Sequence, residues 1–261
     1  MTPTTRPDPW LGLRRLTPAR IALGRAGASL PTAAALDFAL AHARARDAVH
    51  APLDARRVAG DLEALGLRSI EVESAAPDRA TYLRRPDLGR RLSADSVGRL
   101  SARGPYDVAL VVADGLSCLA VHTHAAPLVA ALQPGFAEAG MRLAPVVIAH
   151  QGRVALGDEV GERLGVRLII VLIGERPGLS SPDSLGAYIT FAPRVGRLDG
   201  ERNCVSNIRA EGLSHAAAAL KILWITREAL RMGLTGVALK DESDLQLLSA
   251  PAVKFRVGPP T

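Results

Sequence analysis

The feature that most constrains the fold is an uninterrupted apolar run at residues 168–173, Leu-Ile-Ile-Val-Leu-Ile, which is rich in β-branched side chains. Such a run predicts a β-strand that is buried on both faces of a sheet. It ends in Gly-Glu-Arg-Pro-Gly at residues 174–178, a sequence typical of a tight loop. Glu175 and Arg176 therefore follow a buried strand directly, at the position where α/β sheets usually bind ligands. A pair of solvated charges would explain the same two residues.

Two further apolar segments precede this run, and each also ends in polar residues and glycine. Patterns typical of helices separate the three segments, and each pattern stops at a glycine. The predicted order is strand 107–114, helix 125–140, strand 144–150, helix 158–165 and strand 168–174. Strands and helices in alternation predict a parallel sheet with right-handed crossovers. We therefore expect the loops at Asp114, Gly152 and Glu175 to share one edge of that sheet.

The remaining patterns complete the predicted fold class, which is α/β. We expect a parallel-sheet α/β domain, Rossmann-like with helices on both faces, preceded by a smaller helical N-terminal region. Further predicted elements are helices at 32–50, 52–65 and 213–232, an edge strand at 70–73, a fourth main strand at 187–191 and a short strand at 235–240. The expected segments are a disordered tail (1–13), the helical N-terminal region (14–100), the α/β domain (101–243) and a C-terminal tail (244–261).

Composition excludes several classes of protein. The net charge of +6 rests almost wholly on arginines that are interleaved with acids, and aromatic residues make up only 3% of the chain. Scattered charges and few stacking residues argue against a nucleic-acid partner. Two cysteines cannot build a disulfide framework, and no apolar stretch is long enough to span a membrane. We expect a cytoplasmic protein with no membrane partner.

No complete catalytic or metal-binding motif is present. His122 and His124 are two residues apart, a spacing that suits one face of a strand better than a helix. Asp114 and Glu175 could act as paired carboxylates, although the sequence does not fix their separation. A free cysteine such as Cys204 is usually a small buried apolar residue. We therefore predict no catalytic residue and no metal ligand in this chain.

The chain contains several longer and unusual motifs, which are Leu-Thr-Pro-Ala-Arg-Ile-Ala-Leu-Gly-Arg-Ala-Gly from residue 16, Asp-Gly-Leu-Ser from 114, Gly-Arg-Val-Ala-Leu-Gly-Asp-Glu-Val-Gly from 152, Gly-Glu-Arg-Pro-Gly-Leu-Ser-Ser-Pro-Asp-Ser-Leu-Gly from 174 and Arg-Asn-Cys-Val-Ser-Asn-Ile from 202. Together these motifs resemble the ethanolamine ammonia-lyase small (light) subunit. The resemblance covers roughly residues 14–243. The tail after it does not match the family pattern, and its role stays open.

The resemblance implies a lyase that converts ethanolamine to acetaldehyde and ammonia by radical chemistry with adenosylcobalamin, a cobalt cofactor. A large TIM-barrel subunit would hold the substrate, and the small subunit, inactive alone, would cover part of the corrinoid in a hetero-oligomer. By motif, the cofactor-binding residues carried over are Val154, Glu175 and Cys204. The resemblance also allows a location inside a bacterial microcompartment, in the course of ethanolamine catabolism.

Single features of the sequence suggest two other functions. The glycines at 24 and 27 could form the phosphate-binding turn of a nucleotide-binding α/β enzyme, although GxxG without a preceding clear strand is a weak signal. A basic module that binds nucleic acid is the less favoured of the two, for the reasons of charge and composition given above.

Overall fold

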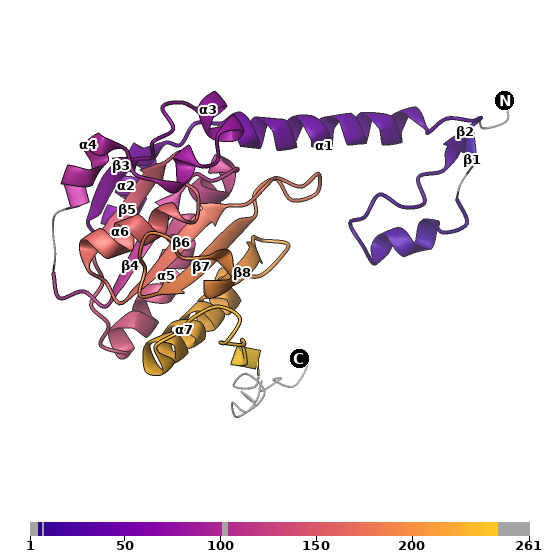
Figure 1. Cartoon of the computed structure of the whole chain (residues 1–261). Coiled ribbons are helices and arrows are strands. Elements are labelled where there is room, and N and C mark those ends of the chain that lie inside the picture. The colour runs from indigo at the N-terminus through magenta and orange to yellow at the C-terminus, as the bar shows by residue number, and fades with distance from the viewer. Residues whose placement is uncertain (1–4, 7, 101–103, 245–261) are drawn as a thin grey trace, which may run out of the picture.

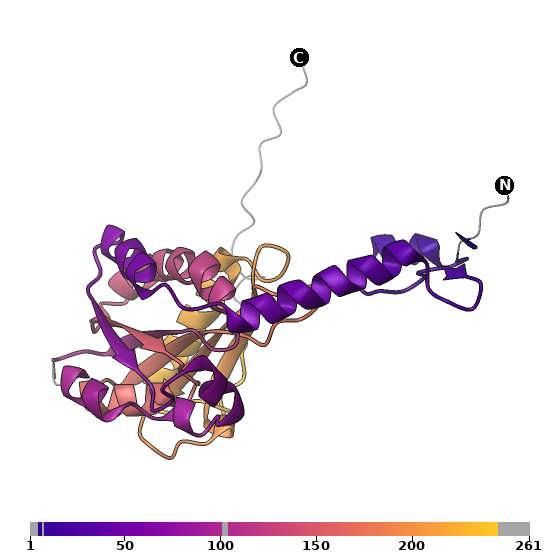
Figure 2. The ribbon, with the colours of Figure 1, turned by 90° about the horizontal axis from the view of Figure 1, so that it is seen from above.

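The computed structural model describes residues 5–6, 8–100 and 104–244, and it divides into a body and an arm. The body, residues 51–100 and 104–244, is a sheet covered by helices. The arm, residues 8–50, projects from it, and its long helix α1 (Thr32–His50) extends away from the sheet in both views (Figures 1 and 2).

The body is built on a six-stranded sheet with the order β3-β5-β4-β6-β7-β8. Neighbouring strands from β3 to β6 are parallel, whereas β7 is antiparallel to β6 and β8 is antiparallel to β7. The strands are β3 (Ser69–Glu73), β4 (Val108–Ala113), β5 (Val146–His150), β6 (Leu168–Gly174), β7 (Leu185–Phe191) and β8 (Asn203–Ile208). The α/β class is confirmed, and the sheet is mixed.

The sheet is parallel from β3 to β6, as predicted, and differs from the prediction only at β7 and β8, which are antiparallel to their neighbours. Strand β7 follows β6 after a connection, residues 175–184, that contains no helix in the structure. A parallel neighbour needs a long crossover, whereas a short connection returns the chain antiparallel to the strand it has left. In addition, β3 comes before the domain boundary expected near residue 100 and yet pairs with β5, so the sheet draws strands from both sides of that boundary.

Helices cover both faces of the sheet and enclose two apolar cores. Alternate residues of β4 point to opposite sides, Val108, Leu110 and Val112 to one core and Ala109, Val111 and Ala113 to the other. The first core lies under α2 (Ala55–Ala64), α5 (Cys118–Glu138) and α7 (His215–Met232), and the second under α6 (Leu156–Leu164) with α4 (Ala94–Val97) and η3 (Gly98–Leu100). Two short elements, α3 (Arg79–Arg84) and η2 (Leu88–Arg90), lie in the chain between β3 and α4.

Two local predictions were wrong. Helix α5 begins at Cys118 and not near residue 125, because Ser117 caps it: the Ser117 hydroxyl oxygen accepts from the Ala120 amide at 3.2 Å. His122 and His124 therefore lie on a helix and not on a strand. Residues 235–240 form turns, with no strand. By contrast, α7 ends before the predicted Gly233, whose φ of 73° is readily reached by glycine.

The arm contains α1 over the range predicted for it, with β1 (Thr5–Arg6), η1 (Leu11–Arg15) and β2 (Arg25–Ala26) nearby in the chain. Strand β1 and the start of η1 thus fall inside the segment expected to be a tail, 1–13, of which residues 1–4 and 7 lie outside the described residues. Of the expected C-terminal tail, only residue 244 is described. Among the helices of residues 5–6, 8–100 and 104–244, none is long and apolar enough to cross a membrane.

Candidate functional site at the carboxyl edge of the sheet

The three loops predicted to share one edge do meet there, and Asp114 joins two of them. This residue follows β4, and its carboxylate accepts hydrogen bonds from the backbone amides of Gln151 and Gly152, both at 2.9 Å, after β5. Arg79 Nη1 lies 3.3 Å from the same carboxylate and also donates to the Gly115 carbonyl. Asp114 is only 1% exposed. It therefore fixes the loop that carries Arg153 and Val154, and the suggestion that it pairs with Glu175 in catalysis finds no support in these contacts.

Burial raises the pKa of Asp114 above its ordinary value, while Arg79 and the two amides favour the charged form. The turn after β4 also packs tightly against β6. A Cβ atom on Gly174 would lie 2.0 Å from the Ser117 carbonyl oxygen, so only glycine fits at the end of β6. The strand ends are consequently held in one fixed arrangement.

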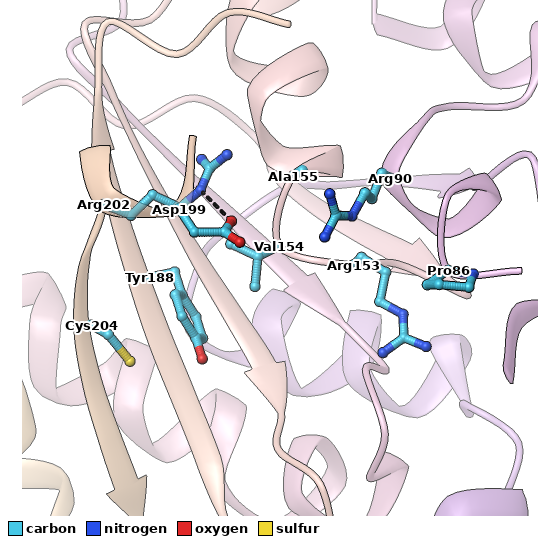
Figure 3. Close-up of a pocket in the computed structure, with 9 residues that line it drawn as sticks. All are labelled: Pro86, Arg90, Arg153, Val154, Ala155, Tyr188, Asp199, Arg202 and Cys204. Atoms are coloured by element: carbon cyan, nitrogen blue, oxygen red, sulfur yellow. Dashed lines mark ion pairs between the residues drawn. The ribbon is translucent and has the colours of Figure 1, made fainter. Parts of the chain in front are cut away.

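A hollow of about 270 Å³ extends from the loop after β5 at this edge to the middle of β7 and the start of β8, and it brings together two of the three predicted cofactor-binding residues. Val154 lies in the middle, with Arg90 and Arg153 on one side and Tyr188 with Cys204 on the other (Figure 3). The full lining is Pro86, Arg90, Arg153, Val154, Ala155, Tyr188, Asp199, Arg202 and Cys204. The hollow thus combines an apolar centre with a polar rim, the mixture typical of ligand sites.

Glu175, the third predicted residue, does not line the hollow but adjoins it. Its Oε2 accepts from the Ser184 hydroxyl at 2.5 Å and from the Asn207 amide at 3.3 Å. A Cβ atom on Gly186 would lie 2.9 Å from Glu175 Oε1 and 3.3 Å from the Tyr188 ring. Glu175 and Tyr188 therefore flank the space above Gly186. In the described part of the chain, Oε1 accepts no hydrogen bond and is available to a ligand.

Cys204 lies on β8 directly opposite Tyr188 on β7. Cys204 is exposed, contrary to the expectation of a buried cysteine, yet partial desolvation of its thiol raises its pKa. Burial likewise raises the pKa of Tyr188. Both groups are therefore protonated at neutral pH, and a neutral thiol is neither a strong nucleophile nor a good metal ligand. The described residues also contain no group of three or more His, Cys, Asp or Glu side chains that could hold a metal ion.

A buried ion pair between Arg202 and Asp158 holds part of the lining of the hollow in place. Arg202 forms two hydrogen bonds to Asp158 on α6, at 2.6 and 2.7 Å, and a third to the Thr190 hydroxyl at 3.0 Å. Arg202 and Asp158 are 8% and 2% exposed. Two parallel bonds from a guanidinium to a carboxylate are strong and geometrically specific. This pair thus fixes the start of β8, which carries Cys204, against α6.

Reasoning from the sequence missed Tyr188 and Arg90 as parts of this site. The sequence predicts only that Tyr188 lies on a strand, and no motif indicates that it pairs with Cys204. Arg90 lies between the predicted strands at 70–73 and 107–114, in a segment for which the sequence predicts no site residue. A basic residue in a connector gives no signal of its own, because its neighbours in space come from a distant part of the chain.

Comparison with known proteins decides the family. The model of the family "Ethanolamine ammonia-lyase light chain (EutC)" matches residues 7–240. The chain is 57% identical to the ethanolamine ammonia-lyase small subunit of Ralstonia nicotianae, over 97% of this chain and 95% of the relative. This chain belongs to the ethanolamine ammonia-lyase small-subunit family.

Other members of the family are similarly close. The small subunit of Pseudomonas fluorescens is 54% identical over 99% of this chain and 98% of its own length. That of Xanthomonas campestris pv. campestris is 58% identical over 95% of this chain and 93% of its own length. The resemblance found in the sequence is therefore confirmed over nearly the whole chain, which is a subunit of a lyase. The name of the family also implies a larger partner subunit.

Proposed function

We propose that this chain binds part of adenosylcobalamin at the interface with the large subunit of ethanolamine ammonia-lyase, within a hetero-oligomer, and is inactive alone. The observation that carries the proposal is the hollow beside the carboxyl edge, which Val154 from the loop after β5 and Cys204 from strand β8 line together. Location inside a microcompartment stays a prediction from the resemblance.

The residues present fit a corrinoid, which is a broad apolar macrocycle rimmed by neutral amides. Val154 and the Tyr188 ring offer apolar surface, and Glu175 Oε1 is a free acceptor for an amide N–H or a hydroxyl group. Cys204, as a neutral thiol, suits a packing contact and not a bond to cobalt. Since the hollow is small, it can take only part of such a ligand, which supports sharing of the cofactor with a partner.

When bound, adenosylcobalamin supplies the radical chemistry through its cobalt–carbon bond. The residues of this chain bind and orient. Asp114 holds the loop of Val154, Arg202 holds the strand of Cys204, and Ser184 with the Asn207 amide orients the Glu175 carboxylate. Covering the corrinoid from this side would also exclude water from a reactive site.

The decisive test is co-expression with a large subunit, followed by measurement of the cobalamin retained by the purified complex. The small subunit alone is expected to deaminate no ethanolamine, and the complex with adenosylcobalamin is expected to be active. Deamination by the small subunit alone would contradict the proposed division of labour.

A substitution tests the site itself. Glu175→Ala should weaken the cobalamin affinity of the complex about tenfold, since one hydrogen bond to a charged group is lost. Arg176→Ala, which alters the exposed next residue, is the matched control and should leave the affinity unchanged. Equal affinities for the two variants would remove Glu175 from the site.

The positions of Gly24 and Gly27 argue against the alternative of a nucleotide-binding enzyme. Gly24 and Gly27 flank β2 in the arm. Strand β2 lies near the end of α1 that is distant from the sheet (Figure 1). A phosphate-binding turn of an α/β enzyme lies between a strand of the sheet and the helix that follows it.

A further inference from the structure

Two arginines on one side of the hollow have no carboxylate partner among the residues that the structure describes. Three guanidinium groups line the hollow, but both nearby carboxylates, Asp158 and Asp199, pair with Arg202. Within the described ranges, no ion pair involves Arg90 or Arg153, and the Arg90 guanidinium makes no hydrogen bond. Elsewhere on the same side of the sheet, Arg163 and Arg197 each have a glutamate partner. We call Arg90 and Arg153 the arginine pair.

The arginine pair is assembled by tertiary contacts. The Arg153 amide donates to the Gly89 carbonyl at 2.8 Å, which ties the residue before Arg90 to the loop after β5. A Cβ atom on Gly89 would lie 2.8 Å from the Tyr82 ring and 2.9 Å from Arg153 Cγ, so a side chain there would push the two segments apart. Figure 3 shows both arginines on the same side of Val154.

Arg153 is held in place by Tyr82, and one of its buried N–H groups has no hydrogen-bond acceptor among the described residues. Its guanidinium carbon lies 4.2 Å from the centre of the Tyr82 ring, and Nη2 donates to the Tyr82 carbonyl at 3.4 Å. The Tyr82 hydroxyl in turn donates to the Gly152 carbonyl at 3.0 Å. Arg153 Nε is buried and has no acceptor in the part of the chain that the structure describes. A buried donor without an acceptor is costly, and an added anion near this guanidinium would lower that cost.

We propose that the arginine pair binds the phosphodiester of the nucleotide loop of cobalamin, an inference that rests on the proposed function. The amide side chains of the corrin are neutral, so this phosphodiester is the group on the periphery of the ligand that carries a negative charge. Guanidinium groups match phosphate oxygens in geometry and retain their charge at every relevant pH. Val154, between the pair and Tyr188, would then contact the apolar surface next to that group.

The test compares ligands with and without the phosphodiester on the large–small complex. Cyanocobalamin carries the nucleotide loop, and dicyanocobinamide lacks it. Affinities are measured by equilibrium dialysis for the wild type, Arg90→Gln, Arg153→Gln and Arg153→Lys. Arg68→Gln is the matched control, because Arg68 is an exposed arginine that precedes β3 at the opposite edge of the sheet.

Arg90→Gln and Arg153→Gln should each weaken cyanocobalamin binding about tenfold, the loss expected for one charge-assisted contact. Dicyanocobinamide should bind more weakly than cyanocobalamin to the wild type and about equally well to all variants. Arg153→Lys keeps the charge and should retain part of the affinity. The preference for cyanocobalamin should also shrink as the salt concentration rises.

Several outcomes would overturn the proposal. Equal losses for both ligands would assign the arginines to the shape of the hollow, and unchanged affinities would remove them from the site. If inorganic phosphate binds the wild-type complex without competing with cyanocobalamin, the arginine pair is a site for free phosphate instead. In each of these cases the wild type still binds cyanocobalamin, whereas a complex that binds neither corrinoid would contradict the proposed function itself.

Discussion

The arm and the body use apolar residues in opposite ways. In the body, the strands and the helices that cover them enclose two cores, and side chains such as Leu110 on β4 and Leu132 on α5 are at most 1% exposed. In the arm, α1 has only Ala41 and Ala48 buried, while Leu36 and Leu40 are 64% and 51% exposed. A helix gains most of its stability in a protein from packing its apolar face. The body therefore supplies the stability of this chain, and α1 contributes little to it.

The two regions also differ in charge. Residues 8–50 contain six arginines and three aspartates, whereas residues 51–244 contain 23 basic and 23 acidic residues. The positive charge of the chain is thus not spread evenly, although it looks scattered along the sequence. In the body, opposite charges are balanced in number and many form pairs. Among the described residues the arginine pair forms no ion pair, and unlike other unpaired arginines of the body, such as Arg68, it lines the hollow beside Val154, which is why it indicates a ligand.

The largest effect expected in the body comes from its buried ion pair. Arg202→Met should lower the free energy of unfolding by about 3–5 kcal/mol, because it leaves the Asp158 carboxylate buried without a partner. Urea denaturation of the purified chain measures the loss. Replacing both partners, with Asp158→Leu added, should recover most of the loss, since two apolar side chains need no partner. A loss of less than about 1 kcal/mol for Arg202→Met would show that this part of the body tolerates change as the arm does.

A matched pair of leucines tests the comparison directly. Leu132→Ala, at a buried site of α5, should cost about 2–5 kcal/mol of unfolding free energy, from lost burial and a cavity. Leu40→Ala, at an exposed site of α1, should change it by no more than about 0.5 kcal/mol. Both values come from the same denaturation experiment. Similar losses at the two sites would mean that the arm packs on the body in solution, and the contrast would fail.

The smallest effect concerns pH. Burial, and next the neighbouring His124, lower the pKa of His215, whose Nε2 lies 3.0 Å from His124 Nδ1. A histidine with a lowered pKa in the folded state binds fewer protons than in the unfolded state. Its contribution to stability is therefore present above the unfolded pKa of about 6.5 and is lost as the pH falls toward the folded value.

The expected result is that stability falls with pH between about 7.5 and 5 less steeply in His215→Gln than in the wild type. Thermal unfolding across this range measures the two slopes. Equal slopes would show that His215 does not contribute to the pH dependence of the body. Asp183, whose carboxylate lies 3.5 Å from His124 Nε2, provides a second variant for the same cluster.

Most of the framework could be predicted from the sequence. The run at 168–173 became β6, the apolar segments before it became β4 and β5, and Asp114, Gly152 and Glu175 share one edge of the sheet as expected. Such predictions succeed because buried parallel strands and amphipathic helices follow from local periodicity. Predictions failed where the signal was not periodic. The start of α5 depends on a cap at Ser117, and the direction of β7 depends on the connection before it.

The candidate site, like the fold, could be predicted only in part from the sequence. The motifs pointed to Val154, Glu175 and Cys204, and the pattern of strands placed the first two at the right edge of the sheet. Only the tertiary structure decided that Tyr188 lies opposite Cys204, that Glu175 stays outside the lining of the hollow, and that Arg90 joins Arg153 beside Val154. The physical reason is that periodicity reports burial within one element. Contacts between side chains depend on register and on hydrogen bonds, such as that from Arg153 to Gly89, between segments far apart in the chain.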